Sequence, residues 1–344
     1  MRDGKKLILC AISVAVLLML TACETKIRQY TRYLCDTDGI IVNELCDVTN
    51  SVFELGELES DISGYAIFAQ YLDDDNIFWV QNNGVSKYNL DSSSSRWITS
   101  SLNLNYSDYC HLQSTATADS FYYFSNRNLY ILDRLTDKYM NLVESDLYSC
   151  VGLPHSSRMC LMNNDQMTIR LFDGGNAQAA TYQLPRKATR AFYFEDADKI
   201  VYMADKRNIY TCRPDGSEDS LLYTQSKKVN WSTMMIPIDN AGRFIIPDRN
   251  SDGQVMMLLD IRDGSSVVLG PAYNPKVHES RTIPIQISLT RDRSKLLYFN
   301  SGAMYKVNLQ DMSTEVIALD NVSGITSACI HPEGNRIAFL CEKK

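Results

Sequence analysis

Residues 331–339 read HPEGNRIAF, a polar turn followed directly by an apolar run. Proline, glycine and asparagine are typical of tight turns, and a short run such as Ile-Ala-Phe bounded by a turn is typical of a β-strand. The same unit of turn and apolar run recurs along the chain, whereas the 3.6-residue periodicity of long amphipathic helices does not. The pattern predicts an all-β protein.

The apolar runs recur at a regular interval. They begin at residues 77, 121, 159, 200, 244, 296 and 337, which are 38 to 52 residues apart. A period of about 40–50 residues is typical of the four-stranded blade of a β-propeller. The repeat therefore predicts a seven-bladed β-propeller, with a pair of β-sandwiches or a ring of six or eight blades as the open alternatives.

The last repeat reaches only two strands before residue 344. An incomplete blade would leave a strand edge exposed inside the ring. Two β-rich stretches near the N-terminus, residues 39–45 and 51–55, offer the missing strands. We therefore expect the N-terminal segment to complete the seventh blade, so that the propeller domain covers residues 36–344.

Two stretches resemble a known repeat family. Residues 331–339, and IYTCRPDGS at 209–217, are similar to TolB-like and WD-type propeller repeats. The first resembles the family pattern Ser-Pro-Asp-Gly-Lys-x-Ile-Ala-Phe, with His331 and Glu333 in place of the serine and aspartate. The Trp-Asp dipeptide of WD repeats is absent. The resemblance covers roughly residues 60–344 and implies the propeller fold, but no particular activity.

The N-terminus has the layout of a secretory signal. Arg2, Lys5 and Lys6 precede an uncharged run from Leu7 to Leu20, which is too short to cross a bilayer comfortably. Leu20-Thr21-Ala22-Cys23 then resembles the lipobox of bacterial lipoproteins. This resemblance implies that residues 1–22 are a cleaved signal peptide and that Cys23 receives a diacylglycerol. Residues 23–35 are expected to form the lipidated N-terminus and tether; an uncleaved membrane anchor is the alternative.

These features predict the location of the protein in the cell and its binding partners. The lipid bilayer, reached through diacylglyceryl Cys23, is one expected partner, because two or more acyl chains anchor a protein stably. The expected location is the cell membrane or outer membrane, outside the cytoplasm. The chain carries 34 basic and 41 acidic side chains, and this acidic excess argues against nucleic acid as a partner.

Two groups of residues are candidate binding or bridging sites. Asp248, Asn250 and Asp252 precede a glycine in the Asp-x-Asn-x-Asp-Gly pattern of calcium loops, although Leu259 replaces the glutamate at the twelfth position. An ordinary hairpin turn explains the same residues. Cys35 and Cys46 flank a turn and form a candidate disulfide. The other cysteines of the exported part lie mostly in apolar runs and are expected to be packed thiols.

A catalytic set is not evident from the sequence. There is no Gly-x-Ser-x-Gly elbow, no His-Glu-x-x-His helix and no glycine-rich nucleotide loop. Cys329 and His331 could face one metal, but packing of small and polar side chains is the favoured interpretation, because structural metal sites usually show clustered ligands. No cofactor is expected beyond the candidate calcium. The main hypothesis is a membrane-anchored, non-catalytic binding module for a protein or envelope polymer. The alternatives are a hydrolase or lyase acting on glycan, and a sensor of a small ligand.

Overall fold

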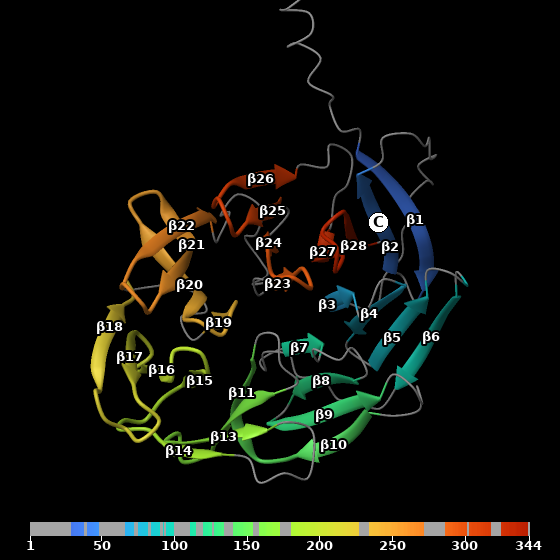
Figure 1. Cartoon of the computed structure of the whole chain (residues 1–344). Coiled ribbons are helices and arrows are strands. Elements are labelled where there is room, and N and C mark those ends of the chain that lie inside the picture. Colours follow the sequence, from blue (N-terminus) through green and yellow to red (C-terminus); the bar gives the residue numbers. More distant parts are fainter. Residues whose placement is uncertain are drawn as a thin grey trace, which may run out of the picture.

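The computed structural model shows a propeller. It describes residues 29–37, 40–47, 66–71, 75–81, 84–89, 92, 94–99, 111–114, 120–125, 127–133, 140–153, 158–172, 180–226, 234–271, 286–300, 303–317 and 325–342. These residues form seven four-stranded antiparallel sheets, arranged as blades in a ring (Figure 1). The predicted all-β class and propeller fold are confirmed.

The first three blades follow one another along the chain. Blade 1 consists of β3 (Ala66–Tyr71), β4 (Asn76–Gln81), β5 (Gly84–Asn89) and β6 (Ser94–Thr99). Blade 2 consists of β7 (His111–Ser114), β8 (Ser120–Ser125), β9 (Asn128–Asp133) and β10 (Met140–Glu144). Blade 3 consists of β11 (Leu147–Gly152), β12 (Met159–Asn163), β13 (Thr168–Phe172) and β14 (Thr181–Gln183).

The next three blades repeat this order, with the first strand innermost and the fourth outermost. Blade 4 consists of β15 (Arg190–Phe194), β16 (Lys199–Ala204), β17 (Asn208–Cys212) and β18 (Ser220–Thr224). Blade 5 consists of β19 (Ile236–Pro237), β20 (Arg243–Asn250), β21 (Gly253–Asp260) and β22 (Ser266–Pro271). Blade 6 consists of β23 (Gln286–Leu289), β24 (Lys295–Asn300), β25 (Ala303–Asn308) and β26 (Thr314–Ile317).

Blade 7 closes the ring with strands from both ends of the chain. Its order from the outside inward is β1 (Gln29–Thr37), β2 (Ile40–Asp47), β28 (Arg336–Glu342) and β27 (Ile325–Ile330). β2 pairs with β28 over seven residue pairs, from Ile40 opposite Glu342 to Cys46 opposite Arg336. The expectation that N-terminal strands complete the seventh blade is confirmed.

The identity of one closing strand differs from the expectation. The outermost strand of blade 7 is β1. The sequence predicts that residues 29–35 belong to the tether and that the propeller begins at residue 36, but β1 already begins at Gln29. Residues 51–55, predicted as the second closing strand, lie outside the described residues. An outermost strand is packed on one edge only, so it does not need the apolar sequence that marks an inner strand. For that reason, QYTRYLCDT did not stand out.

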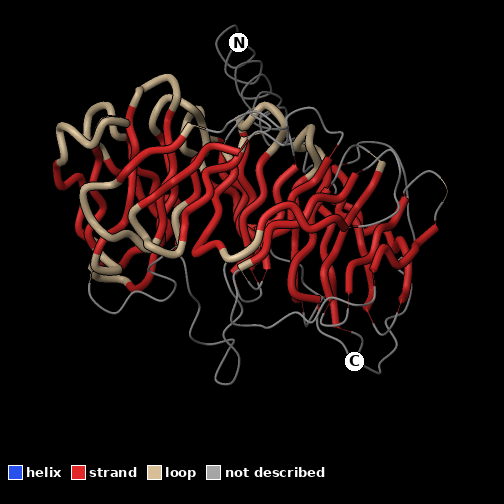
Figure 2. The backbone as a smooth tube through the Cα atoms, turned by 90° about the horizontal axis from the view of Figure 1, so that it is seen from below, coloured by secondary structure: helices blue, strands red, loops and turns tan. Residues whose placement is uncertain are grey.

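The antiparallel order gives the ring two distinct faces. In blades 1 to 6, we call face 1 the face with the turns that join inner to second and third to outer strands, and face 2 the face with the turns between second and third strands and the connections between these blades. In blade 7, face 1 carries the turn between β27 and β28, whereas the end of β1 and the beginning of β2 lie on face 2, beside Glu342. Figure 2 shows the strands crossing between these two faces, with the described loops gathered at their ends.

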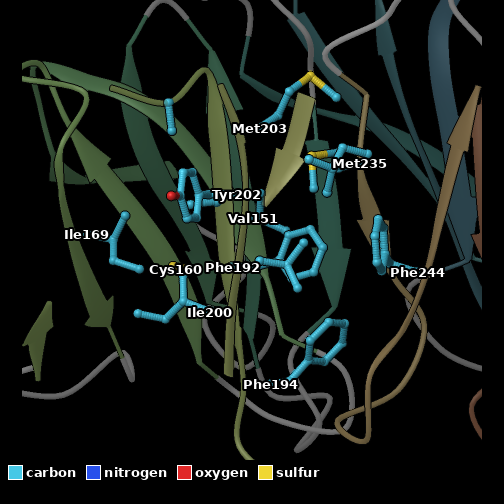
Figure 3. Packing of buried hydrophobic residues seen from close by; sticks show 14 of the residues in the cluster. Val151, Cys160, Ile169, Phe192, Phe194, Ile200, Tyr202, Met203, Met235 and Phe244 are labelled. Atoms are coloured by element: carbon cyan, nitrogen blue, oxygen red, sulfur yellow. The ribbon is translucent and has the colours of Figure 1, made fainter. Parts of the chain in front are cut away.

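Burial falls from the centre of the ring to its rim. The inner strand β15 and the second strand β16 are buried almost throughout, because each blade packs between two neighbours. The outer strands β18 and β22 are largely exposed. A shared core joins the blades: Phe192 of blade 4 lies 5.5 Å from Phe244 of blade 5, ring centre to ring centre, and Val151 of blade 3 belongs to the same cluster (Figure 3).

Candidate functional site

Asp248 is the most heavily bonded of the predicted site residues. It lies in β20 with 1 % of its surface exposed. Its carboxylate accepts hydrogen bonds from the Tyr223 hydroxyl and from the backbone N–H groups of Ser226 (2.8 Å) and Arg249 (2.7 Å). Tyr223 and Ser226 belong to the end of blade 4, whereas Asp248 belongs to blade 5. The carboxylate therefore links two blades.

The rest of the proposed calcium loop is a hairpin on face 2. Asn250 pairs with Gly253, so only Ser251 and Asp252 lie between β20 and β21. The Asn250 side-chain oxygen accepts the N–H of Asp252 at 2.9 Å, and both residues are exposed. Because both oxygens of Asp248 and the oxygen of Asn250 are engaged in these bonds, the geometry matches the hairpin alternative. Binding of calcium by Asp248, Asn250 and Asp252 stays a prediction.

A second link joins blades 3 and 4. Arg186, in the connection after β14, donates from Nε to Asp219 at 3.0 Å, and its guanidinium lies 4.6 Å from the centre of the Tyr210 ring. Asp219 also accepts the hydroxyl of Tyr202, which stacks on Tyr210 at 5.6 Å. Burial, together with the Asp219 carboxylate, raises the pKa of Tyr202 and keeps its hydroxyl a donor.

Other neighbouring blades are joined in the same way, by a side chain of one blade that bonds to the backbone of the next. These bonds run from Arg190 Nη1 to Cys150 O (3.2 Å), Gln225 Nε2 to Pro247 O (2.7 Å), Arg243 Nη1 to Leu309 O (3.2 Å), Thr314 Oγ1 to Leu269 O (2.8 Å) and Ile330 N to Ser288 Oγ (2.8 Å). Blades 3 to 7 are thus tied one to the next, which makes this part of the ring a stiff platform.

The turns of face 1 are rich in aspartate for a local reason. Asp239 accepts the N–H groups of Ala241, Gly242 and Arg243, each at 2.9 Å, and so holds its own turn in shape. Burial opposes ionisation of this carboxyl, but the bonds from Arg243 and the backbone outweigh it and lower the pKa of Asp239. Asp215, Asp292 and Asp311 each accept bonds from a serine two residues later. These carboxylates form turns; they do not converge on a common point.

The cysteines follow the packing expectation where their side chains are described. Cys150, Cys160 and Cys212 are free and buried, and Cys329 is also buried. Burial raises the pKa of both Cys150 and Cys160 to about 12, so neither is a nucleophile at neutral pH.

The register of β1 and β2 does not bring the candidate disulfide pair together. Cys35 lies opposite Val42, while Cys46 lies opposite Tyr30, five residues further along β1. Five strand residues span about 16 Å, far beyond the separation of Cα atoms that a disulfide can bridge. β1 and β2 do form a hairpin, as expected, but the two cysteines lie at different positions along its length.

His331 ends the inner strand of blade 7 and is 2 % exposed. Its Nδ1 accepts the N–H of Glu333 at 3.1 Å, and its Nε2 contacts the guanidinium of Arg336. The cation occupies the place that a metal ion would need. Within the described ranges, no group of three or more His, Cys, Asp or Glu residues is placed to hold a metal ion.

The predicted lipidation site, Cys23, and the whole lipobox lie outside the described residues. In the portion of the chain that the structure describes, no helix is long and apolar enough to cross a membrane. Sequence reasoning did not identify Tyr223, Arg186 or Asp219, because each acts on a neighbouring blade that the local sequence does not reveal.

Comparison with known proteins supports the fold. No protein-family model matches the chain, and no curated protein matches it. Among solved structures, it is similar to the WD40 β-propeller domain of Doa1, with a TM-score of 0.52 and 13 % sequence identity, over 86 % of this chain and 98 % of that one. The likeness extends over nearly the whole of that domain, so the chain has a β-propeller fold of the kind seen in WD40 domains.

Proposed function

We propose that this protein is a lipid-anchored, extracytoplasmic binding module that presents a rigid propeller to a protein or envelope polymer. The observation that carries the proposal is the linkage of successive blades by buried side chains, such as Asp248 with Tyr223 and Ser226. A stiff ring holds its turns in fixed positions, and a preorganised surface binds a partner at a lower entropic cost. Domains of the WD40 type supply the structural parallel.

The anchoring part of the proposal rests on residues 20–23, the lipobox-like sequence Leu-Thr-Ala-Cys. Acylation of the Cys23 thiol and its new amino group would hold the body at the outer side of a membrane after removal of the signal. The acidic balance of the chain makes the anchor, and not charge attraction to anionic lipid, the source of membrane binding.

The experiment is crosslinking in intact cells, followed by capture of the anchored protein and identification of what is bound to it. A matched control keeps residues 1–28 and replaces the propeller with an unrelated domain, so that the anchor is unchanged. A partner captured with the native protein and lost from the control supports the binding module. If the two captures are identical, the propeller is not the binding element and the proposal fails.

A second variant, Cys23→Ala, tests the anchor separately. Without the thiol no diacylglycerol can be attached, so the protein is expected to leave the membrane fraction and lose the mass of the acyl chains. If the variant stays in the membrane with unchanged mass, the lipidation part of the proposal is wrong, whatever the capture experiment shows.

A further inference from the structure

The position of β1 determines where an anchor at Cys23 attaches to the propeller. β1 is the outermost strand of blade 7, so the chain enters the ring at its rim. Gln29 pairs with Asp47 at one end of the hairpin. Cys46, next to Asp47, pairs with Arg336, which directly follows the face-1 turn at residues 331–335. The anchor therefore joins the propeller at the rim of blade 7, on the side of face 1.

The tether between Cys23 and this point is short. Only residues 24–28 separate the two, and a fully extended chain advances at most about 3.6 Å per residue. The Cα atoms of Cys23 and Gln29 are therefore no more than about 22 Å apart, whatever the conformation of the residues between them. Since the acyl chains would hold Cys23 at the membrane surface, the beginning of β1 must lie close to that surface.

Charge determines how the ring is oriented at this short distance. The two face-1 turns of blade 4, residues 195–199 and 213–219, carry six acidic side chains. Four basic side chains pair with them, namely Lys199, Arg213, Arg158 and Arg186, so the acidic excess of this group is two. An anionic membrane surface repels such turns over about a Debye length. This repulsion disfavours an orientation in which the ring lies flat with face 1 on the lipid headgroups. If the ring tilts so that the rim of blade 7 faces the membrane, the turns of blade 4 move away from the membrane surface.

We propose that blade 7 is the edge of the propeller that faces the bilayer, and that blades 3 and 4, across the ring, point away from it. This inference rests on the lipidation of Cys23 in the proposed function. It deepens that function, since it assigns the lipid headgroup surface to one edge and leaves the opposite blades accessible to a partner. Figure 1 shows β1 and β2 on the side of the ring opposite β14 to β18.

The test measures distances to the membrane with the full-length lipidated protein in vesicles of phosphatidylcholine and phosphatidylglycerol that carry a headgroup-bound energy acceptor. A donor dye is attached through an unnatural amino acid at one of three exposed positions. Glu333 reports on face 1 of blade 7, Asp196 on face 1 of blade 4, and Lys206 on face 2 of blade 4.

Energy transfer should be strongest from position 333 and weak from both 196 and 206. Blades 7 and 4 lie on opposite sides of the ring, and a four-stranded blade alone is about 14 Å wide, so the difference should be about twofold or more. Inserting a Gly-Ser linker of about 20 residues between positions 27 and 28, which behaves as a flexible coil, should abolish the difference.

Equal transfer from 333 and 196 would show that the ring lies flat, and strongest transfer from 206 would show that it is inverted; either result overturns the orientation. Protein that does not float with the vesicles, and whose mass shows no acyl chains, would instead overturn the lipidation on which the inference depends. The two failures are therefore distinguishable.

Discussion

Tyr223, in the outer strand of blade 4, donates its hydroxyl hydrogen to the carboxylate of Asp248 in blade 5. Burial and this carboxylate raise the pKa of the Tyr223 hydroxyl, so the donor keeps its hydrogen at neutral pH. The bond is one member of a group that also engages the backbone N–H groups of Ser226 and Arg249. It is the basis of the first prediction.

The variant Asp248→Ala should lower the free energy of unfolding by about 3 kcal/mol, because it leaves three partly buried hydrogen bonds without their acceptor. Urea denaturation followed by fluorescence measures this. Asp252→Ala, in the exposed hairpin of the same sequence motif, is the matched control and should change stability by less than about 0.5 kcal/mol. Equal losses in the two variants, together with a melting temperature that rises on addition of calcium, would favour the calcium-loop interpretation over the hairpin.

Gly270 should not tolerate a side chain. A Cβ atom at this position would meet the hydroxyl of Tyr298, which is buried and has no hydrogen-bond partner among the described residues. Gly270→Ala should therefore destabilise the protein by about 2 kcal/mol, a typical cost of overpacking. Adding Tyr298→Phe removes the obstructing oxygen and should recover most of the loss. A double variant no more stable than Gly270→Ala would place the cost in the backbone.

The buried thiols should not react with disulfide reagents in the folded protein. At pH 8 a disulfide reagent should not react with Cys150 or Cys160 until denaturant is added, since burial raises the pKa of both from 9.0 to about 12. The measurement is thiol titration with and without denaturant, followed by mass spectrometry to locate the label. Labelling of either cysteine in the native protein at the rate of a free peptide thiol would contradict this.

The same shifts make stability depend on pH in the alkaline range. The unfolded chain ionises these thiols near pH 9, whereas the folded chain keeps them protonated up to about pH 12. Their contribution is therefore fully present below pH 9 and is lost as pH rises toward 12. Thermal melts between these limits should show a steeper decline for the native protein than for a Cys150→Ala, Cys160→Ala double variant.

Closure of blade 7 should stabilise the whole ring. Val42 lies in β2, paired with Cys35 on one side and Leu340 on the other. Proline there removes an N–H from the sheet and should lower the free energy of unfolding by about 3 kcal/mol or more. Hydrogen exchange should show faster opening in distant blade 4 as well, whereas Val42→Ala should leave blade 4 protected. If exchange in the proline variant changes in blade 7 alone, closure does not govern the ring.

The outer strand of blade 5 should be a weak point for self-association. β22 contains no charged residue, and Val267 and Val268 are 40 % and 49 % exposed on this free edge. Val268→Lys should reduce the concentration-dependent rise in light scattering and leave stability within about 0.5 kcal/mol, because a charged edge resists strand pairing. Val316→Lys in β26, a strand that already carries Glu315, should have a smaller effect. Equal effects would argue against the β22 edge.

The repeat was readable from the sequence because inner and second strands are buried on both sides and must be apolar, as in residues 200–203. The outermost strand β1 was not, because its sequence QYTRYLCDT mixes polar and apolar residues without a regular period and includes charges. The Asp-x-Asn-x-Asp-Gly pattern at 248–253 was ambiguous for a different reason. Its first aspartate bonds to residues more than twenty positions earlier, and no local pattern records that partner.

Blade 7 is built from strands that are far apart in the sequence, and this has a consequence for folding during synthesis. Its sheet joins residues 29–47 to residues 325–342, so the first strands to emerge from the ribosome must wait for the last before they find their partners. Contacts this distant in sequence form slowly, and until they form the early strands present open edges. A product that stops short of its final two strands cannot close its ring and should be recognisable to proteases. The ring can therefore close only after β27 and β28 have been synthesised.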